Sequence, residues 1–309
     1  MSTLIISHPA CLEHLTPAGH PERPDRLRAV ERALEAEKFQ MLARAQAPRG
    51  AFETIALCHP MDYIEGLRDA SPEEGIIQLD ADTSMSPGSF EAILRAAGGA
   101  IFAVDEVFAK KAVNAFVATR PPGHHAETAR PMGFCYFDNA GIAARHAQKR
   151  YGIGRAAIVD FDVHHGNGSQ EIFWSDKTVM YCSTHQMPLF PGTGAVSESG
   201  DFNTVVNAPL RPGDGAEKFR DAFESRILPR LAEFAPELVI ISAGFDAHYR
   251  DPLANINLEE ADFAWVTQKI MDVADRHAGG RVVSLLEGGY DLQALGNSVA
   301  AHVTALMRG

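Results

Sequence analysis

The chain has 309 residues, of which 46% are hydrophobic and 22% are charged, so it can bury a sizeable core and does not have the composition of an extended coil. Its formal net charge of -12 argues against a phosphate-binding surface, so we expect no nucleic-acid partner; the charge suits a cationic substrate such as a lysine-rich peptide or a polyamine. No apolar run approaches the ~20 residues that a helix needs to cross a bilayer, which argues against membrane insertion.

The cysteine pattern and the first residues bear on the compartment. The four cysteines are scattered without CxxC spacing, at Cys11, Cys58, Cys135 and Cys182. The opening residues, MSTLIISHPA, lack the basic start, the apolar run and the cleavage site of a signal peptide. We therefore expect a protein of the reducing cytoplasm.

The first part of the chain is expected to hold one strand and two long helices. The strand covers residues 3–7, and a loop crowded with histidine and proline follows it. Apolar residues at helical spacing predict helices at about 26–39 and 89–109, and a turn-rich acidic segment at 72–88 is expected to be a loop.

From about residue 112 onward, strands and helices are expected to alternate. The predicted strands are 115–118, 156–161, 179–182, 238–242 and 282–286, and the predicted helices are 138–150, 216–234, 258–277 and 292–306. This alternation is typical of a mostly parallel sheet with helices on both faces. Because no linker or repeat interrupts it, we expect a single α/β domain over residues 1–309.

Polar motifs follow the predicted strands of this second half. They are RPPGHHAE, DFDVHHGN, STH, AGFDAH and EGGY, in chain order. Ligands of open parallel sheets bind beyond the carboxyl ends of the strands, so these motifs are expected to meet at one edge. An unrelated set of residues would instead be scattered over helix faces and loops.

A metal site is expected within this edge. Asp162 and His164 stand two residues apart where a strand ends, so both side chains would project to the same side as a chelating pair. Asp246 is the best third ligand, since it also follows a strand and Gly244 lets the backbone turn before it. Considered alone, Asp246 would be a helix cap or a turn carboxylate. Together the three predict a zinc site with an open position for water.

Two adjacent histidines supply candidate bases. His124 and His125 follow two prolines and a glycine, and the ligand count favours proton transfer over metal binding for them. Asp160 and Asn167 are available to orient one ring each, and the ring held by the asparagine should be the less basic. Tyr290, after the last strand, would donate to a developing oxyanion, although alone it would be interpreted as a packed tyrosine.

Six motifs then resemble a known family. RPPGHHAE, GFCYFDNAGIA, VDFDVHHGNG, FPGTG, AGFDAH followed by DPL, and EGGY stand in the order seen in zinc-dependent histone deacetylases and their bacterial relatives, the deacetylase-like and acetylpolyamine amidohydrolases. The resemblance covers nearly the whole chain, and the PPGHHA form with Asn167 resembles the class II branch. It implies the arginase/deacetylase fold, a single α/β domain around an eight-stranded parallel sheet.

The resemblance also implies roles for individual residues. It makes the zinc ligands Asp162, His164 and Asp246, the general base and acid His125, its electrostatic partner His124 backed by Asp160, and the oxyanion donor Tyr290. The acyl-lysine channel would be walled by Phe134, next to Gly133, and by Phe190. A structural potassium ion would use main-chain oxygens of Asp160, Asp162, His164 and Thr184 and the hydroxyl of Ser183, and a second would lie near Phe173, Asp176 and Val179.

Alternatives remain at several positions. Arginases share the fold but bind two manganese ions through DxHxD, and the last position here is Gly166, which favours one metal. Polyamine-selective relatives carry a glutamate where this chain has Leu253, so an acylated lysine fits better than a long polycation. Asp82 would hold the substrate backbone or serve only as a turn residue, and we favour the turn.

The sequence thus predicts a zinc-dependent amidohydrolase that removes an acetyl or other short acyl group from acyl-lysine or a related acylated amine. The rival predictions are an acetylpolyamine amidohydrolase, a non-catalytic reader of acylated amines and a structural metal protein. The oligomeric state stays open, a homo-oligomer included, and so does the choice between zinc and iron(II) in the cell.

Overall fold

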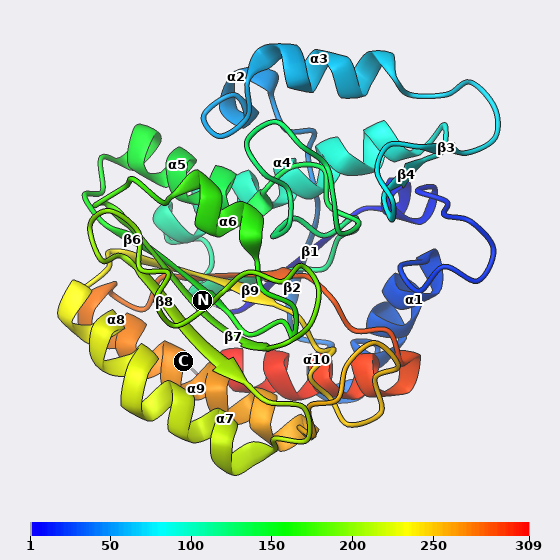
Figure 1. Ribbon diagram of the computed structural model, residues 1–309. Coiled ribbons are helices and arrows are strands. Elements are labelled where there is room, and N and C mark those ends of the chain that lie inside the picture. The colour runs from blue at the N-terminus through cyan, green and yellow to red at the C-terminus, as the bar shows by residue number, and fades with distance from the viewer. Residues whose placement is uncertain (1, 309) are drawn as a thin grey trace.

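Eight parallel strands form one central sheet in the computed structural model, which describes residues 2–308. Their order across the sheet is β2-β1-β5-β10-β9-β6-β7-β8 (Figure 1). The strands are β1 (Leu4–Ser7), β2 (Ala43–Gln46), β5 (Asn114–Val117), β6 (Ala156–Asp160), β7 (Val179–Gln186), β8 (Val205–Leu210), β9 (Leu238–Ala243) and β10 (Val282–Leu286). The predicted α/β fold with an eight-stranded parallel sheet is therefore confirmed.

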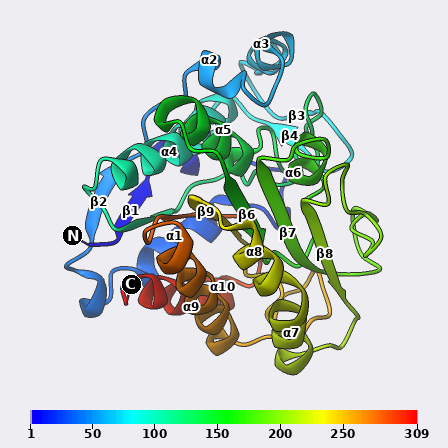
Figure 2. The ribbon, with the colours of Figure 1, turned by 90° about the vertical axis from the view of Figure 1, so that its left-hand side faces the viewer.

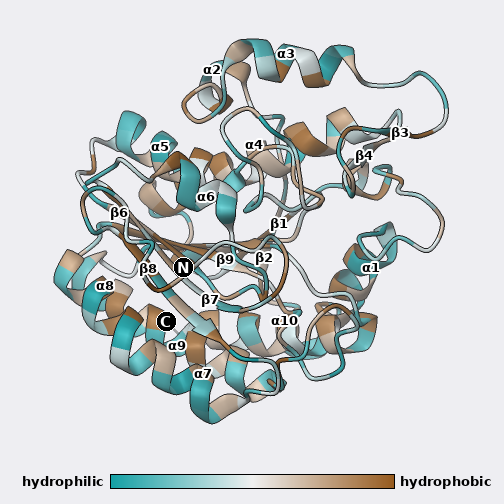
Figure 3. Cartoon of the chain, viewed as in Figure 1, coloured by the Kyte–Doolittle hydropathy of each residue, from teal (hydrophilic) through white to brown (hydrophobic). Residues whose placement is uncertain are grey.

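Helices cover both faces of this sheet (Figures 1 and 2). One face carries α4 (Ser89–Phe108) and α5 (Asn139–Tyr151). The other carries α1 (Pro24–Ala33), α7 (Ala216–Ala222), α8 (Leu228–Phe234), α9 (Glu260–His277) and α10 (Leu292–Leu306). In Figure 3 the strands are largely brown, whereas the helices mix brown and teal, as expected for helices with one buried face.

Two predicted helices differ from the observed ones in detail. The helix predicted at 26–39 ends at Ala33, and a short 3-10 turn, Glu37–Phe39, follows it. The helix predicted at 216–234 is divided into α7 and α8 by a π turn, Phe223–Ile227. Pro229 explains this division, since its ring nitrogen has no hydrogen for the regular ladder.

Two edge strands were not predicted. The four residues of β2, ARAQ, are mostly exposed and show no apolar alternation, because only one neighbouring strand covers them. In β8, Pro209 has no backbone N–H to donate to a neighbouring strand, and such a residue is tolerated at the edge of a sheet. An edge strand has one neighbour to satisfy, so its sequence carries a weaker pattern.

Several short elements lie in segments for which no helix or strand was predicted. They are α2 (Phe52–Ile55), α3 (Met61–Asp69), α6 (Asn167–Ile172) and a two-stranded antiparallel ribbon of β3 (Ile77–Gln78) and β4 (Ser84–Met85). The loop prediction for residues 72–88 is thus wrong at these two strands. Among residues 2–308, no helix is long and apolar enough to cross a membrane.

The sheet order brings the polar motifs together. The strands β5, β10, β9, β6 and β7 are consecutive neighbours, and all of them are parallel. Their carboxyl ends therefore open at one edge of the sheet, and the loops after them carry the predicted motifs. A ligand-binding site is therefore expected at this edge.

Candidate active site

Three candidate metal ligands converge at the carboxyl ends of β6 and β9. One ligand atom each from Asp162, His164 and Asp246 lies within 4.8 Å of the others, and all three residues are buried. The Nδ1 atom of His164 is 3.2 Å from Asp162 Oδ1 and 3.0 Å from Asp246 Oδ2. Burial would lower the pKa of His164, yet hydrogen bonds to the two carboxylates raise it to about 10. The site therefore favours positive charge at this point.

The two carboxylates are fixed by backbone groups. The N–H of Gly288 donates to Asp162 Oδ2 at 2.8 Å, and the N–H of Val163 donates to Asp246 Oδ1 at 2.8 Å. A Cβ on Gly288 would lie 2.2 Å from Asp246 Oδ2, so only glycine lets this backbone approach. The three side chains form a preorganised set of two oxygens and one nitrogen, which fits a divalent metal ion.

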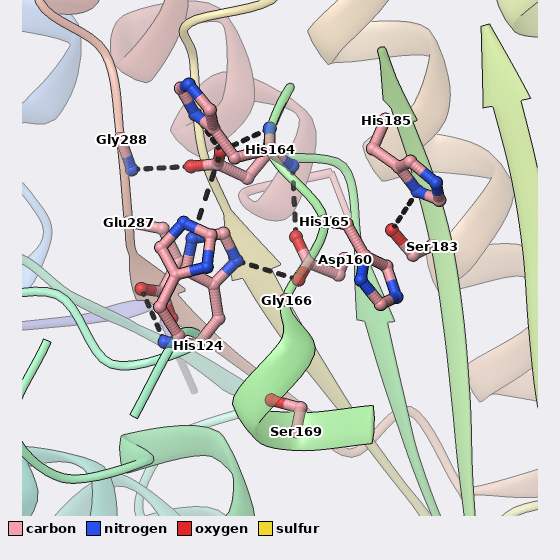
Figure 4. Close-up of polar contacts among 12 residues, drawn as sticks. His124, Asp160, His164, His165, Gly166, Ser169, Ser183, His185, Glu287 and Gly288 are labelled. Carbon is pink, nitrogen blue, oxygen red and sulfur yellow. Dashed lines mark hydrogen bonds and ion pairs between the residues drawn. The ribbon is translucent and has the colours of Figure 1, made fainter. Parts of the chain in front are cut away.

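His124 is paired with a carboxylate. Its Nδ1 lies 2.9 Å from Asp160 Oδ2 (Figure 4). The hydroxyl of Tyr181 donates to the same oxygen at 3.0 Å. Burial alone would lower the pKa of His124, but the charges of Asp160 and Asp162 outweigh it and hold this pKa well above its usual value. His124 is therefore a cation at neutral pH.

His125 is paired with an amide instead. Its Nδ1 lies 2.8 Å from Asn167 Oδ1, and its ring centroid is 4.0 Å from that of His124. Burial, followed by the charges of His124 and His164, lowers the pKa of His125 well below its usual value. The asparagine-held ring is the less basic of the two, and it is neutral beside a charged neighbour.

Tyr290 and His125 line one cavity, which is described below. The backbone N–H of Tyr290 donates to Asp251 Oδ2 at 2.7 Å, and the guanidinium of Arg26 lies 4.9 Å from the ring centroid of Tyr290. Burial raises the pKa of Tyr290 well above its usual value, although Arg26 opposes the change. The hydroxyl therefore keeps its proton and can act as a donor.

A cavity of about 220 Å³ joins these groups to the surface. It is lined by Asp82, His125, Gly133, Phe134, His164, Leu189, Phe190, Leu253 and Tyr290. The structure thus brings all five predicted substrate-binding residues to one cavity. Larger hollows of about 430 and 750 Å³ lie elsewhere and contain none of these side chains.

The walls of this cavity are closely packed around His125. The ring centroid of Phe190 is 5.2 Å from that of His125, and that of Phe134 is 6.0 Å from that of Tyr290. A Cβ on Gly133 would lie 2.4 Å from Cδ2 of His125. Asp82 Oδ1 accepts from the N–H of Gly133 at 2.9 Å, so Asp82 holds this wall in addition to lining the cavity.

The residues suggested for potassium fall into two groups. Asp160 and Ser183 are register partners across β6 and β7, and Thr184 follows directly. The Ser183 hydroxyl lies 2.9 Å from His185 Nδ1 (Figure 4), and Thr184 Oγ1 is buried without a hydrogen-bond partner among the described residues. This group adjoins the metal ligands.

The second group lies near the start of β7, at the opposite edge of the sheet. The backbone N–H of Asp176 donates to the carbonyl oxygen of Phe173 at 3.1 Å, and Val179 opens the strand. The Asp176 carboxylate is 2.6 Å from a guanidinium nitrogen of Arg145. This carboxylate is therefore already paired within the protein.

Four supporting residues were not predicted from the sequence. Glu287 Oε2 accepts from the N–H of Gly123 at 2.7 Å. It also accepts from the N–H of His124 at 3.3 Å (Figure 4). The other three are Tyr181, Asp251 and Arg26, which contact Asp160 or Tyr290 as described above. Glu287 and Asp251 lie inside motifs already noticed, EGGY and DPL, whereas no local pattern distinguishes Tyr181 or Arg26.

Known proteins resemble this chain along most of its length. The histone deacetylase domain profile matches residues 20–306. The histone deacetylase-like amidohydrolase of Pseudomonas aeruginosa is 39% identical over 280 residues, which cover 88% of this chain and 73% of that protein. The probable deacetylase of Archaeoglobus fulgidus is 39% identical over 302 residues, 95% of this chain and 82% of that protein.

A plant protein and a solved structure extend the comparison. Histone deacetylase 14, chloroplastic, of Arabidopsis thaliana is 39% identical over 324 aligned positions, covering 98% of this chain and 76% of that protein. The crystal structure of the HDA15 HD domain superposes with a TM-score of 0.94 at 34% identity, covering 99% of this chain and 88% of that one. Similarity in sequence and similarity in fold therefore agree.

Proposed function

This chain belongs to the histone deacetylase family and has the arginase/deacetylase fold, and we propose that it is a zinc-dependent amidohydrolase. The proposed reaction removes an acetyl or other short acyl group from an acylated lysine side chain or a related acylated amine. The observation that carries the proposal is that the Asp162, His164 and Asp246 triad adjoins one cavity lined by a neutral His125 and by Tyr290.

Zinc is the proposed metal because two carboxylates and one imidazole are the donor set of a catalytic zinc with an open coordination position. When bound, it would polarise the acyl carbonyl and lower the pKa of a water beside it. The carboxylates need little rearrangement for this, since the N–H groups of Gly288 and Val163 already orient them.

His125 is proposed as the general base and then the general acid. Its Nδ1 is engaged by Asn167, which leaves Nε2 as the nitrogen available to the cavity. The lowered pKa keeps the ring neutral, so that it can take a proton from water and later deliver it to the departing amine. His124, a buried cation 4.0 Å away between ring centroids, would stabilise the negative charge that develops on the substrate.

Tyr290 is proposed as the hydrogen-bond donor to the developing oxyanion. Its raised pKa keeps the proton on the hydroxyl, and Arg26 and Asp251 hold the residue from two sides. A donor fixed in advance stabilises the transition state without reorganising during the reaction.

The shape of the cavity supports an acylated lysine as substrate. Phe134 and Phe190 would flank the aliphatic stem of the lysine, and Leu253 adds a further apolar side chain. The net charge of -12 also suits a cationic peptide or an acetylpolyamine, but Leu253 offers no carboxylate to a second amine.

Further assignments are part of the same proposal. A structural potassium ion beside Asp160 and Ser183 is supported by the buried Thr184 hydroxyl that lacks a hydrogen-bond partner among the described residues. A cytoplasmic location is supported by four buried cysteines, all of them free. Residues 1–309 are proposed to act as one catalytic domain.

A turnover panel on zinc-loaded protein tests the proposal. It would contain acetyl-, propionyl- and longer acyl-lysine peptides, acetylputrescine and acetylspermidine. Faster turnover of the lysine peptides is expected, and faster turnover of the polyamines would identify an acetylpolyamine amidohydrolase. Binding without turnover would identify a reader, and loss of stability on chelation without any hydrolysis would identify a structural metal protein.

A further inference from the structure

We propose that Glu127 is a positioning residue that sets the tautomer of His125 by holding the side-chain amide of Asn167 in one orientation. The inference rests on the proposed function, because it concerns the ring that would take the proton from water. Glu127 lies at the start of a tight turn and is only partly buried; it belongs neither to the metal-ligand triad nor to the residues that line the substrate cavity.

The contacts of Asn167 divide cleanly between its two ends. Its Oδ1 lies 2.8 Å from His125 Nδ1. Its Nδ2 lies 2.8 Å from Glu127 Oε1, 3.3 Å from Met132 Sδ and 3.5 Å from the backbone carbonyl oxygen of His125. All three groups around Nδ2 are acceptors, and one of them carries a full negative charge. These three acceptors can therefore bind the amide nitrogen of Asn167 but not its oxygen.

The opposite orientation is excluded by charge. Rotating the amide by half a turn would place its oxygen where Nδ2 now stands, 2.8 Å from the Glu127 carboxylate. A charge-assisted hydrogen bond would be replaced by repulsion between two acceptors. The repulsion would act in a buried environment, since Asn167 is only 6% exposed.

The orientation of the amide decides which nitrogen of His125 carries the hydrogen. With Oδ1 facing the ring, Nδ1 must donate, and Nε2 keeps the lone pair that a general base needs. With Nδ2 facing the ring, Nδ1 would accept, and Nε2 would carry a hydrogen toward the cavity. A ring in that second state cannot take a proton from water through Nε2.

The neighbouring histidine needs no such control. His124 faces the carboxylate of Asp160, which in its charged form can only accept, so the Nδ1 of His124 is always the donor. An asparagine has a donor and an acceptor on nearly identical ends, so it can satisfy either tautomer of the ring that it holds. Only the amide-held ring therefore requires a further group, and Glu127 supplies it.

The backbone of Glu127 is held independently of its side chain. Its N–H donates to the carbonyl of Arg130 at 3.1 Å, and the N–H of Arg130 donates back at 3.4 Å. The next residue, Thr128, is tied to the exposed Glu171 through two hydrogen bonds of 2.9 Å and 2.7 Å. Substitutions of Glu127 are therefore expected to change the charge near Asn167 without unfolding the turn.

The test compares Glu127→Lys with Glu127→Gln and a matched control, all as zinc-loaded protein. A lysine would donate to Asn167 and favour the rotated amide, so kcat on an acetyl-lysine peptide should fall by about 10² while KM changes little. A glutamine can still accept from Nδ2, so Glu127→Gln should lose less than about tenfold. Glu217→Lys makes the same charge change on an exposed side chain of α7, away from this turn, and should retain full kcat.

A direct readout of the ring accompanies the kinetics. Nitrogen-15 NMR of histidine-labelled protein, assigned with His125→Gln, distinguishes protonated from unprotonated ring nitrogens. We expect the hydrogen on Nδ1 in the unsubstituted protein and on Nε2 in Glu127→Lys. The double variant Glu127→Lys with Asn167→Asp should return the hydrogen to Nδ1, because a carboxylate accepts from both the ring and the lysine.

The two proposals fail in distinguishable ways. If the unsubstituted protein hydrolyses no acylated amine, the proposed function is wrong, and the NMR comparison still decides the role of Glu127. If Glu127→Lys keeps the hydrogen on Nδ1, or if Glu217→Lys loses as much kcat as Glu127→Lys does, the positioning role is overturned.

Discussion

The Oε2 atom of Glu287 accepts a 2.7 Å hydrogen bond from the backbone N–H of Gly123, and this contact joins the loop after β10 to the loop after β5. The same oxygen accepts from the N–H of His124 at 3.3 Å, so one buried side chain supports the loop of both histidines. Burial raises the pKa of Glu287 to about 8, although the charge of His124 opposes the change. Burial therefore favours the neutral carboxyl group more than exposure to solvent would.

We predict that Glu287→Gln is tolerated and that Glu287→Leu is not. A glutamine keeps a neutral acceptor for the two N–H groups, whereas a leucine leaves them buried and unpaired at a cost of about 1–3 kcal/mol. The leucine variant should unfold at lower urea concentration and should also lose kcat. Equal stability of the two variants in urea unfolding would show that the hydrogen bonds to Glu287 are dispensable.

Tyr290→Phe should mainly lower kcat, by a factor on the order of 10² to 10³, because it removes one donor to the oxyanion and little packing. The ring would keep its place between Arg26 and Phe134. Steady-state kinetics on an acetyl-lysine peptide measure the effect. A variant with full activity would make Tyr290 a packing residue only.

Asp246→Ala should strongly weaken zinc binding. Removing one of three ligand side chains is expected to weaken zinc binding by more than roughly 100-fold, which exceeds the usual effect of losing a residue that only supports a ligand. Metal content after dialysis, measured by mass spectrometry, is the readout. Asp82→Asn is the control, since Asp82 lines the cavity outside the triad and its loss should leave zinc content unchanged.

Gly133→Ala should displace the ring of His125 and so lower activity. The added Cβ would lie 2.4 Å from Cδ2 of His125, and the residue has a φ of 57°, so the ring must move out of its hydrogen bond with Asn167. We expect kcat to fall by more than about tenfold, as when a general base is displaced.

Gly213→Ala provides the matched control for this substitution. Gly213 also has a positive φ, 94°, but a Cβ there would meet no atom within 4 Å. It should lose about 1 kcal/mol of stability from backbone strain and keep its activity. If both alanine variants lose kcat equally, contact with His125 is not the cause.

His302 should make the protein less stable at acid pH. It is fully buried between the hydroxyls of Thr267 at 2.6 Å and Ser284 at 2.8 Å, and burial lowers its pKa to about 3. The unfolded chain, with a histidine pKa of about 6.5, then binds more protons than the folded one, so stability falls as pH drops below about 6.5 and continues to fall toward about pH 3.

The size of this effect can be measured by urea unfolding. Between about pH 7 and about pH 5, His302 should account for a loss of about 2 kcal/mol, which His302→Gln should remove from the pH dependence. His277→Gln, at the end of α9, is the control and should keep the steep dependence. If the two variants show equal slopes, His302 does not cause the acid lability.

The metal ligands could be predicted from the sequence because they lie in short segments beside the strands. Strand residues and ligand residues are adjacent in VDFDVHHGNG and AGFDAH, and parallel strands put their carboxyl ends at one edge. The order of the strands in the sheet could not be predicted in this way. The edge strands β2 and β8 escaped prediction because each has one neighbour and so carries a weak apolar pattern.

By itself, the sequence determined the α/β class, the parallel sheet and the residues that meet at its edge, because spacing along a strand fixes which side chains share a face. The tertiary structure decided which partner each histidine takes: Asp160 holds His124, and Asn167 holds His125. It also decided that Glu127 faces the amide of Asn167, 40 residues away in the chain. Such contacts depend on how separate loops pack against one another, and no local pattern of residues encodes that.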